Sequence, residues 1–224
     1  MRRVFLAFAF VAMFALAANA GVVTLTFEGL QTSEGVLNYY NGGLGSLGSG
    51  PGPSYGITFG SDSLAIISAA DGGGGNFDGN PSGDTILFFL GGPGDVMDVA
   101  AGFTTGFSFY YSAPSYAGSV SVYSGLDGTG TDLGDLTLPL TPNGNSYGPP
   151  CSGSYTYCPW IPIGVTFAGT AESVIFTGTA NYIGFDDVTL GASIPDQGTP
   201  EPGAFSLLGL GLASLGMYAR RKKA

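Results

Sequence analysis

The sequence contains no histidine at all, and no lysine or arginine between residues 4 and 219. Catalytic triads, Schiff-base lysines, histidine-ligated zinc sites and phosphate-binding loops each need a residue type that this long central part lacks. Nucleic acid is excluded as a partner as well, because phosphate contacts depend on Lys and Arg. The six basic side chains all lie at the two ends: Arg2, Arg3, Arg220, Arg221, Lys222 and Lys223.

The central part is acidic instead. Residues 21–199 hold fifteen Asp and Glu side chains and no base, so no salt bridge between side chains can form there. Each carboxylate must be solvated, accept hydrogen bonds or bind a cation. Among common catalytic designs, a pair of carboxylates flanking a glycosidic bond remains compatible with this composition. We expect that the adjacent Asp186 and Asp187 cannot form such a pair alone, since neighbours in a strand point to opposite faces.

The first twenty residues have the pattern of a secretory signal peptide. Arg2 and Arg3 form a short positive segment, residues 4–17 are apolar and uncharged, and residues 18–20 (Ala-Asn-Ala) offer the small side chains that a signal peptidase accepts. Cleavage is therefore predicted after Ala20, which leaves Gly21 at the start of the mature chain.

The end of the chain has three parts in a fixed order. A Pro-Glu-Pro sequence at 200–202 is followed by the uncharged stretch 204–219 and then by the basic cluster 220–223. As a helix the uncharged stretch would reach roughly 24 Å, short of a hydrocarbon core of about 30 Å, so it spans only if the bilayer thins or flanking residues snorkel. The basic cluster should remain cytoplasmic, which places the mature domain on the outer side of the inner membrane.

This tail resembles the PEP-CTERM sorting signal of Gram-negative bacteria. The resemblance implies transit through an exosortase-type protease, removal of the tail, and delivery to the cell surface or an exopolysaccharide matrix. A plain tail anchor that is never cut is the open alternative. The matching residues are Pro200, Glu201 and Pro202 as the sorting motif and Arg220, Arg221, Lys222 and Lys223 as the stop-transfer signal.

The whole chain is accordingly divided into five segments. They are a signal peptide (1–20), a β-sandwich domain (21–194), a linker with the Pro-Glu-Pro motif (195–203), a transmembrane sorting helix (204–219) and a basic cytoplasmic tail (220–224).

The residue pattern of the mature part predicts an all-β domain. Residues 21–199 hold 36 of the chain's 40 glycines and 12 of its 14 prolines, which show no collagen-like period and separate short segments rich in β-branched and aromatic residues, whereas no window sustains a helical period. We predict an antiparallel β-sandwich, most simply a jelly roll, with the Gly-rich loops 40–55, 71–83 and 141–160 at its ends. The predicted strands are 22–28, 56–59, 63–69, 85–90, 103–111, 119–123, 135–140, 163–167, 173–177 and 181–190.

Two short stretches suggest a family for this domain. Residues 182–190 (YIGFDDVTL) resemble the final strand of galactose-binding-like and carbohydrate-binding jelly rolls, and residues 25–30 (LTFEGL) are similar to their beginnings. The resemblance implies neighbouring first and last strands that share a structural calcium ion. Glu28 with Asp186 or Asp187 is then the candidate calcium site. Edge carboxylates that deter aggregation between strands are the alternative.

A second oxygen-rich loop contains Asp71 and Asp78 together with Asn76, Asn80 and Asp84. Hard cations such as calcium bind several oxygen ligands, and extracellular sites are adapted to high calcium concentrations. The spacing is not that of an EF-hand, because no Glu occupies the twelfth position. A solvated loop made flexible by glycine is therefore the alternative to a calcium site.

Cys151 and Cys158 are the only cysteines, and in an exported chain they are expected to form a disulfide. Tyr155, Tyr157 and Trp160 lie within or just after the loop that this disulfide would close. Aromatic rings on a rigid loop are suited to stacking on sugars. The alternative is that these rings fill one end of the core.

These features predict an exported, non-enzymatic cell-surface or extracellular-matrix protein. Calcium, polysaccharide and a second copy of the chain are its candidate partners, besides signal peptidase, the processing protease and, before processing, the membrane. The alternative is a secreted carboxylate-dependent glycan hydrolase. Two carboxyl groups roughly 5 to 9.5 Å apart in an aromatic cleft would favour that enzyme.

Overall fold

A computed structural model of the protein describes residues 21–92 and 94–196. The predicted signal peptide, the Pro-Glu-Pro motif, the helix 204–219 and both basic clusters lie outside these residues. Within the described part, no helix is long and apolar enough to cross a membrane.

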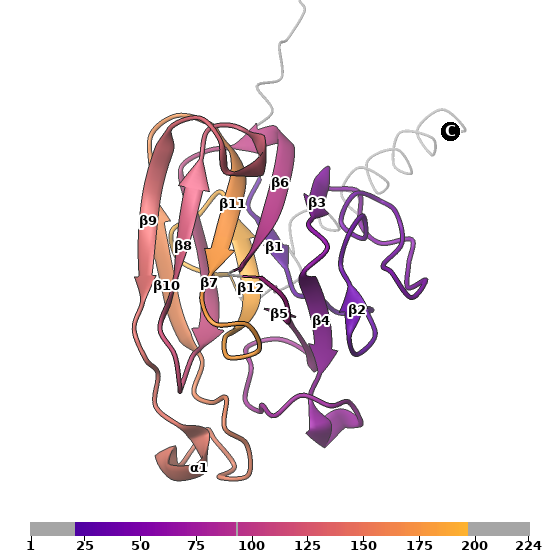
Figure 1. The fold of residues 1–224 in the computed structure, drawn as a ribbon, viewed down its shortest axis with the longest axis vertical. Coiled ribbons are helices and arrows are strands. Elements are labelled where there is room, and N and C mark those ends of the chain that lie inside the picture. Colours follow the sequence, from indigo (N-terminus) through magenta and orange to yellow (C-terminus); the bar gives the residue numbers. More distant parts are fainter. Residues whose placement is uncertain (1–20, 93, 197–224) are drawn as a thin grey trace, which may run out of the picture.

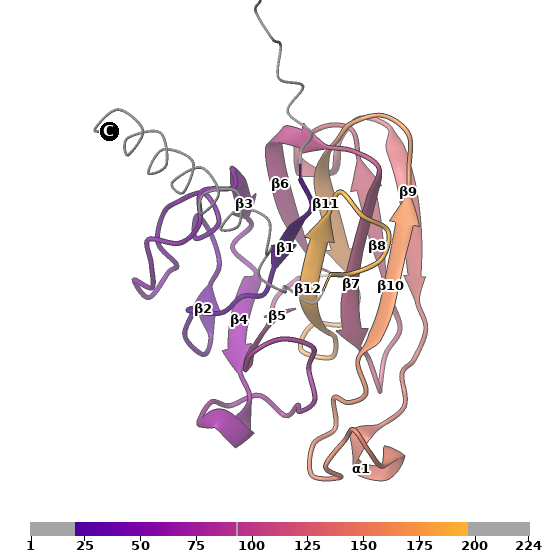
Figure 2. The same ribbon diagram turned by 180° about the vertical axis from the view of Figure 1, so that it is seen from behind.

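Two antiparallel sheets pack face to face to form a β-sandwich (Figures 1 and 2). The larger sheet has the order β10-β7-β12-β5-β4-β2, with β1 also paired to β12, and the smaller has the order β3-β6-β11-β8-β9. The larger sheet contains β1 (Val23–Leu25), β2 (Glu34–Gly35), β4 (Ser63–Ile67), β5 (Thr85–Phe89), β7 (Gly106–Ser112), β10 (Ile161–Thr166) and β12 (Gly184–Leu190). The smaller contains β3 (Ile57–Phe59), β6 (Gly94–Phe103), β8 (Gly118–Tyr123), β9 (Asp132–Leu138) and β11 (Ala171–Thr177).

The core between the sheets is rich in phenylalanine. Phe185 of β12 lies 5.0 Å from Phe176 of β11 and 5.5 Å from Phe109 of β7, measured between ring centroids. All three side chains are fully or almost fully buried. Edge-to-face contacts of this kind join the two sheets, and each ring removes a large apolar area from water.

The predicted fold class, an all-β antiparallel sandwich, is confirmed. Two strands were not predicted, the short β2 and the ten-residue β6. The sequence of β6 (GDVMDVAAGF) contains Gly, Ala and Asp, which are depleted in strands, so it gives little local signal. It is a strand because β3 and β11 pair with it on its two sides. The predicted strand 103–111 is also broken by a turn at Thr104 and Thr105, which separates β6 from β7.

Two of the three long loops lie together at one end of the sandwich. Residues 71–83 and 141–160 are linked there by hydrogen bonds between Asn76 and Thr156. This end also holds the 3-10 helix η1 (Ala69–Asp71) and the single-turn helix α1 (Gly144–Tyr147) (Figure 1). The third loop, residues 40–55, lies beside β2, where Ser46 bonds to Gly35. The expectation that all three loops gather at the sandwich ends is therefore met by two of them.

The first and last strands are direct neighbours. β1 pairs antiparallel with the second half of β12, with Val23 opposite Leu190 and Leu25 opposite Val188. Glu28, three residues beyond β1, thereby comes to the same region as the Asp pair in the middle of β12.

Candidate functional site

β12 contains a bulge at its two aspartates. Asp187 has a φ of 47°, and the pairing with β7 shifts register between Asp186 and Thr189. A bulge interrupts the strict alternation of side chains. As a result the Ser82 hydroxyl reaches both carboxylates, 3.3 Å from Asp186 Oδ1 and 2.5 Å from Asp187 Oδ1. The prediction that these neighbours must point to opposite faces is therefore wrong.

The two aspartates are fully buried but differ in their partners. Asp186 Oδ2 accepts from the Asn80 amide at 3.2 Å and from the Ser82 N–H at 3.3 Å, and its Oδ1 accepts from the Asp187 N–H at 2.8 Å. In contrast, Asp187 Oδ2 is buried with no hydrogen-bond partner among the described residues. One serine hydroxyl carries a single proton, so Ser82 can fully satisfy only one carboxylate at a time.

Glu28 lies next to this pair and is half-buried. Its Oε1 accepts from the N–H groups of Asp84 at 3.0 Å and Thr85 at 2.8 Å, which ties the end of β1 to the start of β5. Its Oε2 has only a long contact of 3.5 Å to the Thr85 hydroxyl. One oxygen of Glu28 therefore retains most of its capacity to bind another group.

The pKa values of these carboxyl groups are all raised. Burial raises the pKa of Asp186 well above its usual value, and the nearby Asp187 adds to this. Burial also raises the pKa of Asp187 to about 6; the Ser82 hydrogen bond opposes the shift, and the charges of Asp196 and Glu28 increase it. Burial likewise raises the pKa of Glu28. Because the mature chain has no base in this region, only a proton or a cation can neutralise the group.

We call Glu28, Asp186, Asp187 and Ser82 the acidic cluster. Its carboxylate and hydroxyl oxygens are ligands that calcium accepts at about 2.3–2.6 Å. A compact metal site would have ligand atoms that all lie within 4.8 Å of one another. In the described residues the three carboxylates of the cluster do not meet this condition, and the only group that does is Asp78 with the two cysteines. Asp187 Oδ2 has no hydrogen-bond partner in the described residues and Glu28 Oε2 has only the long contact to Thr85, so these two oxygens are available to bind an ion.

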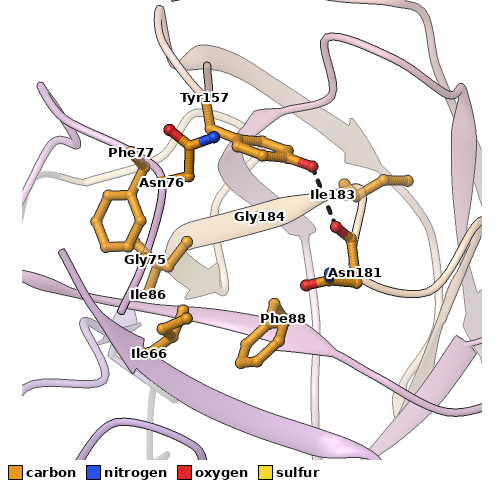
Figure 3. Close-up of a pocket in the computed structure, with 10 residues that line it drawn as sticks. All are labelled: Ile66, Gly75, Asn76, Phe77, Ile86, Phe88, Tyr157, Asn181, Ile183 and Gly184. Atoms are coloured by element: carbon orange, nitrogen blue, oxygen red, sulfur yellow. Dashed lines mark hydrogen bonds between the residues drawn. The ribbon is translucent and has the colours of Figure 1, made fainter. Parts of the chain in front are cut away.

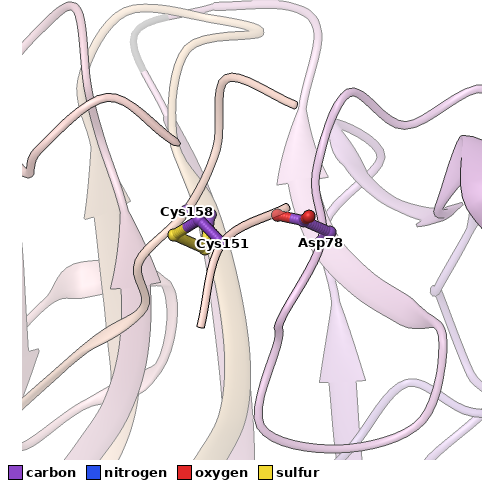
Figure 4. Close-up of side chains that lie close together, drawn as sticks. All are labelled: Asp78, Cys151 and Cys158. Carbon is purple, nitrogen blue, oxygen red and sulfur yellow. A yellow bond between two sulfur atoms is a disulfide. The ribbon is translucent and has the colours of Figure 1, made fainter. Parts of the chain in front are cut away.

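Asp78 is adjacent to the disulfide that joins Cys151 and Cys158 (Figure 4). The predicted disulfide is present, with the two sulfurs 2.04 Å apart. Because sulfur in a disulfide is not a thiolate ligand, this group does not form a metal site. Asp78 instead joins two loops, since it accepts the Ser152 N–H at 2.9 Å through Oδ2 and the Trp160 indole N–H at 3.0 Å through its carbonyl.

The other predicted ligands of the 71–84 loop lie apart from the acidic cluster. Asp71 is exposed at the end of η1, and no hydrogen bond in the described residues joins Asp71 or Asp78 to the cluster. The same loop instead contributes Asn80 and Ser82. No local sequence pattern identifies Ser82 as a member of this site, because its hydrogen bond to Asp187 joins residues that are more than a hundred positions apart in the chain.

A shallow hollow lies on the outer face of the larger sheet (Figure 3). Its floor consists of Ile66, Ile86 and Phe88, which alternate with the core-facing residues of β4 and β5. Its rim includes Tyr157 and Asn181, whose backbone carbonyl accepts from the Tyr157 hydroxyl at 3.1 Å. The hollow encloses about 320 Å³, part of it open to solvent, and no charged side chain lines it.

A pair of exposed tyrosines adjoins Asn181 but does not line the hollow. Tyr182 follows Asn181 and is 39% exposed, and Tyr116 is 47% exposed. Their rings meet edge to face with centroids 4.6 Å apart. Burial raises the pKa of Tyr157 to about 12, and the nearby Tyr182 phenol adds to the shift.

Of the three aromatic residues predicted to stack on a ligand, only Tyr157 lines the hollow. Trp160 is 8% exposed and packs against Phe77, with ring centroids 5.9 Å apart. It also lies close to Gly184, where a side chain would meet the indole ring. Trp160 thus supports the hollow, within a small cluster outside the main core. Tyr155 is half-buried and does not line the hollow.

The end of the chain matches a known family model. Residues 199–223 correspond to the PEP-CTERM protein-sorting motif. The chain carries a PEP-CTERM sorting signal. It is accordingly an exported protein that is anchored in the membrane during transit and then processed.

No curated protein sequence matches the chain. Among solved structures, it is similar to the K2 cleaved adhesin domain of Lys-gingipain, with 18% identity, 78% of this chain and 99% of that chain covered, and a TM-score of 0.49. It is also similar to a carbohydrate-binding module from Cellvibrio mixtus lichenase 5A, with 14% identity, coverage of 59% and 88%, and a TM-score of 0.35. A β-1,3-glucan-binding module from Bacillus halodurans shows 18% identity, coverage of 62% and 87%, and a TM-score of 0.34.

Proposed function

We propose that this exported chain is a non-enzymatic protein of the cell surface or extracellular matrix of a Gram-negative bacterium, and that its β-sandwich binds calcium at the acidic cluster. The observation that carries the proposal is the pair of fully buried aspartates, one with an oxygen that lacks any partner in the described residues. No basic side chain exists between residues 4 and 219 to compensate them. A divalent cation supplies the missing positive charge.

The chemistry of the cluster favours calcium over other metals. All of its ligand atoms are oxygens, whereas zinc is usually bound by nitrogen and sulfur. Magnesium demands a nearly ideal octahedron and keeps several waters, which suits a cluster with two fully buried carboxylates poorly. Calcium tolerates irregular geometry, and extracellular calcium sites bind with dissociation constants of roughly 0.1 to 1 mM.

Thermal unfolding of the full chain, purified in detergent, tests this proposal. Calcium at a hundred times its dissociation constant should stabilise the chain by about 2.7 kcal/mol relative to EDTA, a rise of several degrees in the midpoint. Magnesium should have a smaller effect. Asp187→Asn should abolish the calcium response, whereas Glu172→Gln on β11 should retain it. Equal midpoints in calcium and in EDTA would contradict a calcium site.

The position of the carboxylates supports a non-enzymatic role. Asp186 and Asp187 are both 0% exposed, so a glycosidic bond could not lie between them without opening the domain. The aromatic hollow, where a sugar could bind, is lined by no carboxylate. Hydrolysis of a polysaccharide panel by the purified chain, lost in Asp186→Asn, would instead establish the glycan-hydrolase alternative.

A second candidate function is polysaccharide binding at the hollow, favoured by the aromatic rings of Phe88 and Tyr157 that line it. Aromatic faces stack on the apolar faces of sugar rings, and the Asn181 amide can hydrogen-bond hydroxyl groups. The sugar is expected to be neutral, because the chain has a net charge of −10 and offers an anionic glycan no base in the mature region. Calcium and polysaccharide binding use different residues and can be tested separately.

A glycan array probed with the full chain, with and without calcium, tests this second function. Tyr157→Ala should weaken binding by about 3- to 10-fold, the range expected for one aromatic contact. Tyr147→Ala is the matched control, since Tyr147 is 50% exposed on α1 and does not line the hollow. An array without any bound glycan would leave a structural role, with self-association measured by the molar mass in solution.

A further inference from the structure

The six residues after β12 form a segment that we call the exit strap, Gly191–Asp196. The strap is bonded to the larger sheet from its first residue. Gly191 donates its N–H to the Gly106 carbonyl and accepts from the Thr105 hydroxyl, both at 2.9 Å. The buried Ser108 hydroxyl then donates to the Ala192 carbonyl at 2.9 Å. These bonds hold the start of the strap against the beginning of β7.

Two glycines allow the strap to lie directly on the sheet. A β-carbon at Gly106 of β7 would come within 2.7 Å of the Ser193 nitrogen, and one at Gly164 of β10 would collide with the Ser193 carbonyl oxygen. Glycine therefore permits a close backbone approach at both positions. Pro195, one residue before the end of the strap, is buried. The strap is thus an integral part of the fold in the described residues.

The far end of the strap is connected to the acidic cluster through one hydroxyl group. Thr189 Oγ1 donates to the Asp187 carbonyl at 2.9 Å and accepts the Asp196 N–H at 3.2 Å. Thr189 is fully buried, so water does not compete for these bonds. The Asp196 carboxylate itself is exposed, and its charge acts on Asp187.

The strength of this charge repulsion depends on whether a cation is present. Without a cation, Asp196 and Asp187 carry like charges and repel each other. A divalent ion bound by the carboxylates of Asp187 and Glu28 cancels their two negative charges, so this repulsion of Asp196 is removed. The bonds of the strap stay the same in both states, but the electrostatic free energy of docking its last residue is less unfavourable when the cation is bound.

We propose that calcium in the acidic cluster removes the repulsion of Asp196 and thereby stabilises the exit strap against β12. This inference rests on the proposed calcium site. Asp196 acts on the ion through its charge and is not counted as a ligand. Calcium thereby determines how firmly the chain is held at the point from which its sorting signal departs.

The contact between Asp196 and Thr189 lies only a few residues before the sorting motif, so it can affect how the chain is processed. The sorting motif begins at residue 199, three residues after Asp196. Three extended residues span at most about 11 Å, so this is the limit of the distance between a docked Asp196 and the first residue of the motif. Release of the whole strap would extend this reach to about 32 Å. Calcium outside the cytoplasm would therefore shorten the tether that the processing protease meets.

Hydrogen exchange measured by mass spectrometry on the full chain in detergent tests the inference. Calcium should slow exchange of the strap amides by at least about fivefold relative to EDTA, the lower end of typical coupling between linked sites. Asp196→Asn keeps the backbone N–H but removes the charge, so most of this slowing should disappear. Glu172→Gln on the opposite sheet is the control and should behave like the unaltered chain. By reciprocity, Asp196→Asn should also weaken calcium binding in calorimetry by the same factor.

The possible outcomes separate this inference from the calcium site on which it rests. If calcium raises the unfolding midpoint but leaves strap exchange unchanged, the coupling is wrong and the calcium site stands. If Asp196→Asn retains the full calcium-induced slowing, Asp196 is not the residue that couples them, and the inference is likewise overturned. If calcium alters neither the midpoint nor the exchange, the calcium site itself is refuted and the inference falls with it.

Discussion

Asp186 and Asp187 are adjacent in β12, yet the hydroxyl of Ser82 reaches both of their carboxylates. In a regular strand these side chains would lie on opposite faces of the sheet. The positive φ of Asp187 and the register shift that follows it bring them to the same side. The result is a buried group of like charges, which is costly unless a proton or a cation compensates it.

Removal of the Ser82 hydroxyl should destabilise the domain. Ser82→Ala deletes the one side-chain donor that the two buried aspartates share and leaves the backbone N–H in place. We expect a loss of about 1–3 kcal/mol in the free energy of unfolding in EDTA, the cost of leaving a buried charged group without its donor. Chemical denaturation of the full chain measures it. Ser154→Ala is the control, because Ser154 is exposed; equal stability of the two variants would contradict the shared role of Ser82.

The stability of the metal-free chain should fall as the pH rises from about 4 to 7. Burial raises the pKa of Asp95 and of Asp187 to about 6 in each case and that of Asp186 further. The folded chain therefore holds protons that the unfolded chain releases near pH 4, and this contribution is lost as the pH passes through the folded pKa.

Asp95 allows the pH effect to be separated from calcium, because it does not belong to the acidic cluster. Burial raises its pKa, and the charge of Asp62 adds to the shift. Asp95→Asn should flatten the decline of the unfolding midpoint with pH in EDTA without altering the calcium response. A midpoint that rises steadily from pH 4 to 7 in EDTA would show that these carboxyl groups are not destabilised by ionisation.

Reduction of the disulfide should loosen the loop that supports the hollow. The bond closes a short loop, which on the chain-entropy model stabilises the fold by about 2 to 3 kcal/mol. Trp160, the sole tryptophan, donates to the Asp78 carbonyl beside this bond, so its fluorescence reports the local packing. Cys151→Ser with Cys158→Ser should shift the emission to longer wavelength and lower the unfolding midpoint. An unchanged spectrum would mean that the loop keeps its packing without the disulfide.

The phenylalanine core should be the most sensitive part of the sandwich. Phe185→Ala leaves a cavity between the two sheets, where the ring contacts Phe109 and Phe176. Truncation of a buried phenylalanine costs about 3–5 kcal/mol, a large share of the stability of a domain. Circular dichroism during heating measures the loss. Leu140→Ala, at a side chain that is 58% exposed, should have little effect, and equal losses would contradict this description of the core.

Local pattern was sufficient for most of the fold. Residues 119–123 and 173–177 were predicted as strands within one or two residues of β8 and β11, because β-branched residues alternate there between turn signals. β6 had no such pattern and was missed, since its conformation depends on pairing with β3 and β11. For the acidic cluster, the sequence indicated Glu28 and the two aspartates, but neither Ser82 nor the bulge that joins them.

The sequence alone determined which functions this protein excludes and that it is exported, through its composition and the signals at its ends. A mature region with many carboxylates and no base excludes most catalytic designs and nucleic acid, and the order of motif, apolar stretch and basic cluster marks the chain for export. These properties depend on which residues are present and on their order, not on the fold.

The tertiary structure decided where those carboxylates act. Register between β7 and β12 turns two adjacent aspartates to one side, long-range packing brings Ser82 and Glu28 to them, and the close approach at Gly106 and Gly164 fixes the exit strap. Each of these relationships joins residues far apart in the chain. Their geometry follows from strand pairing and packing over the whole domain, which no local sequence pattern specifies.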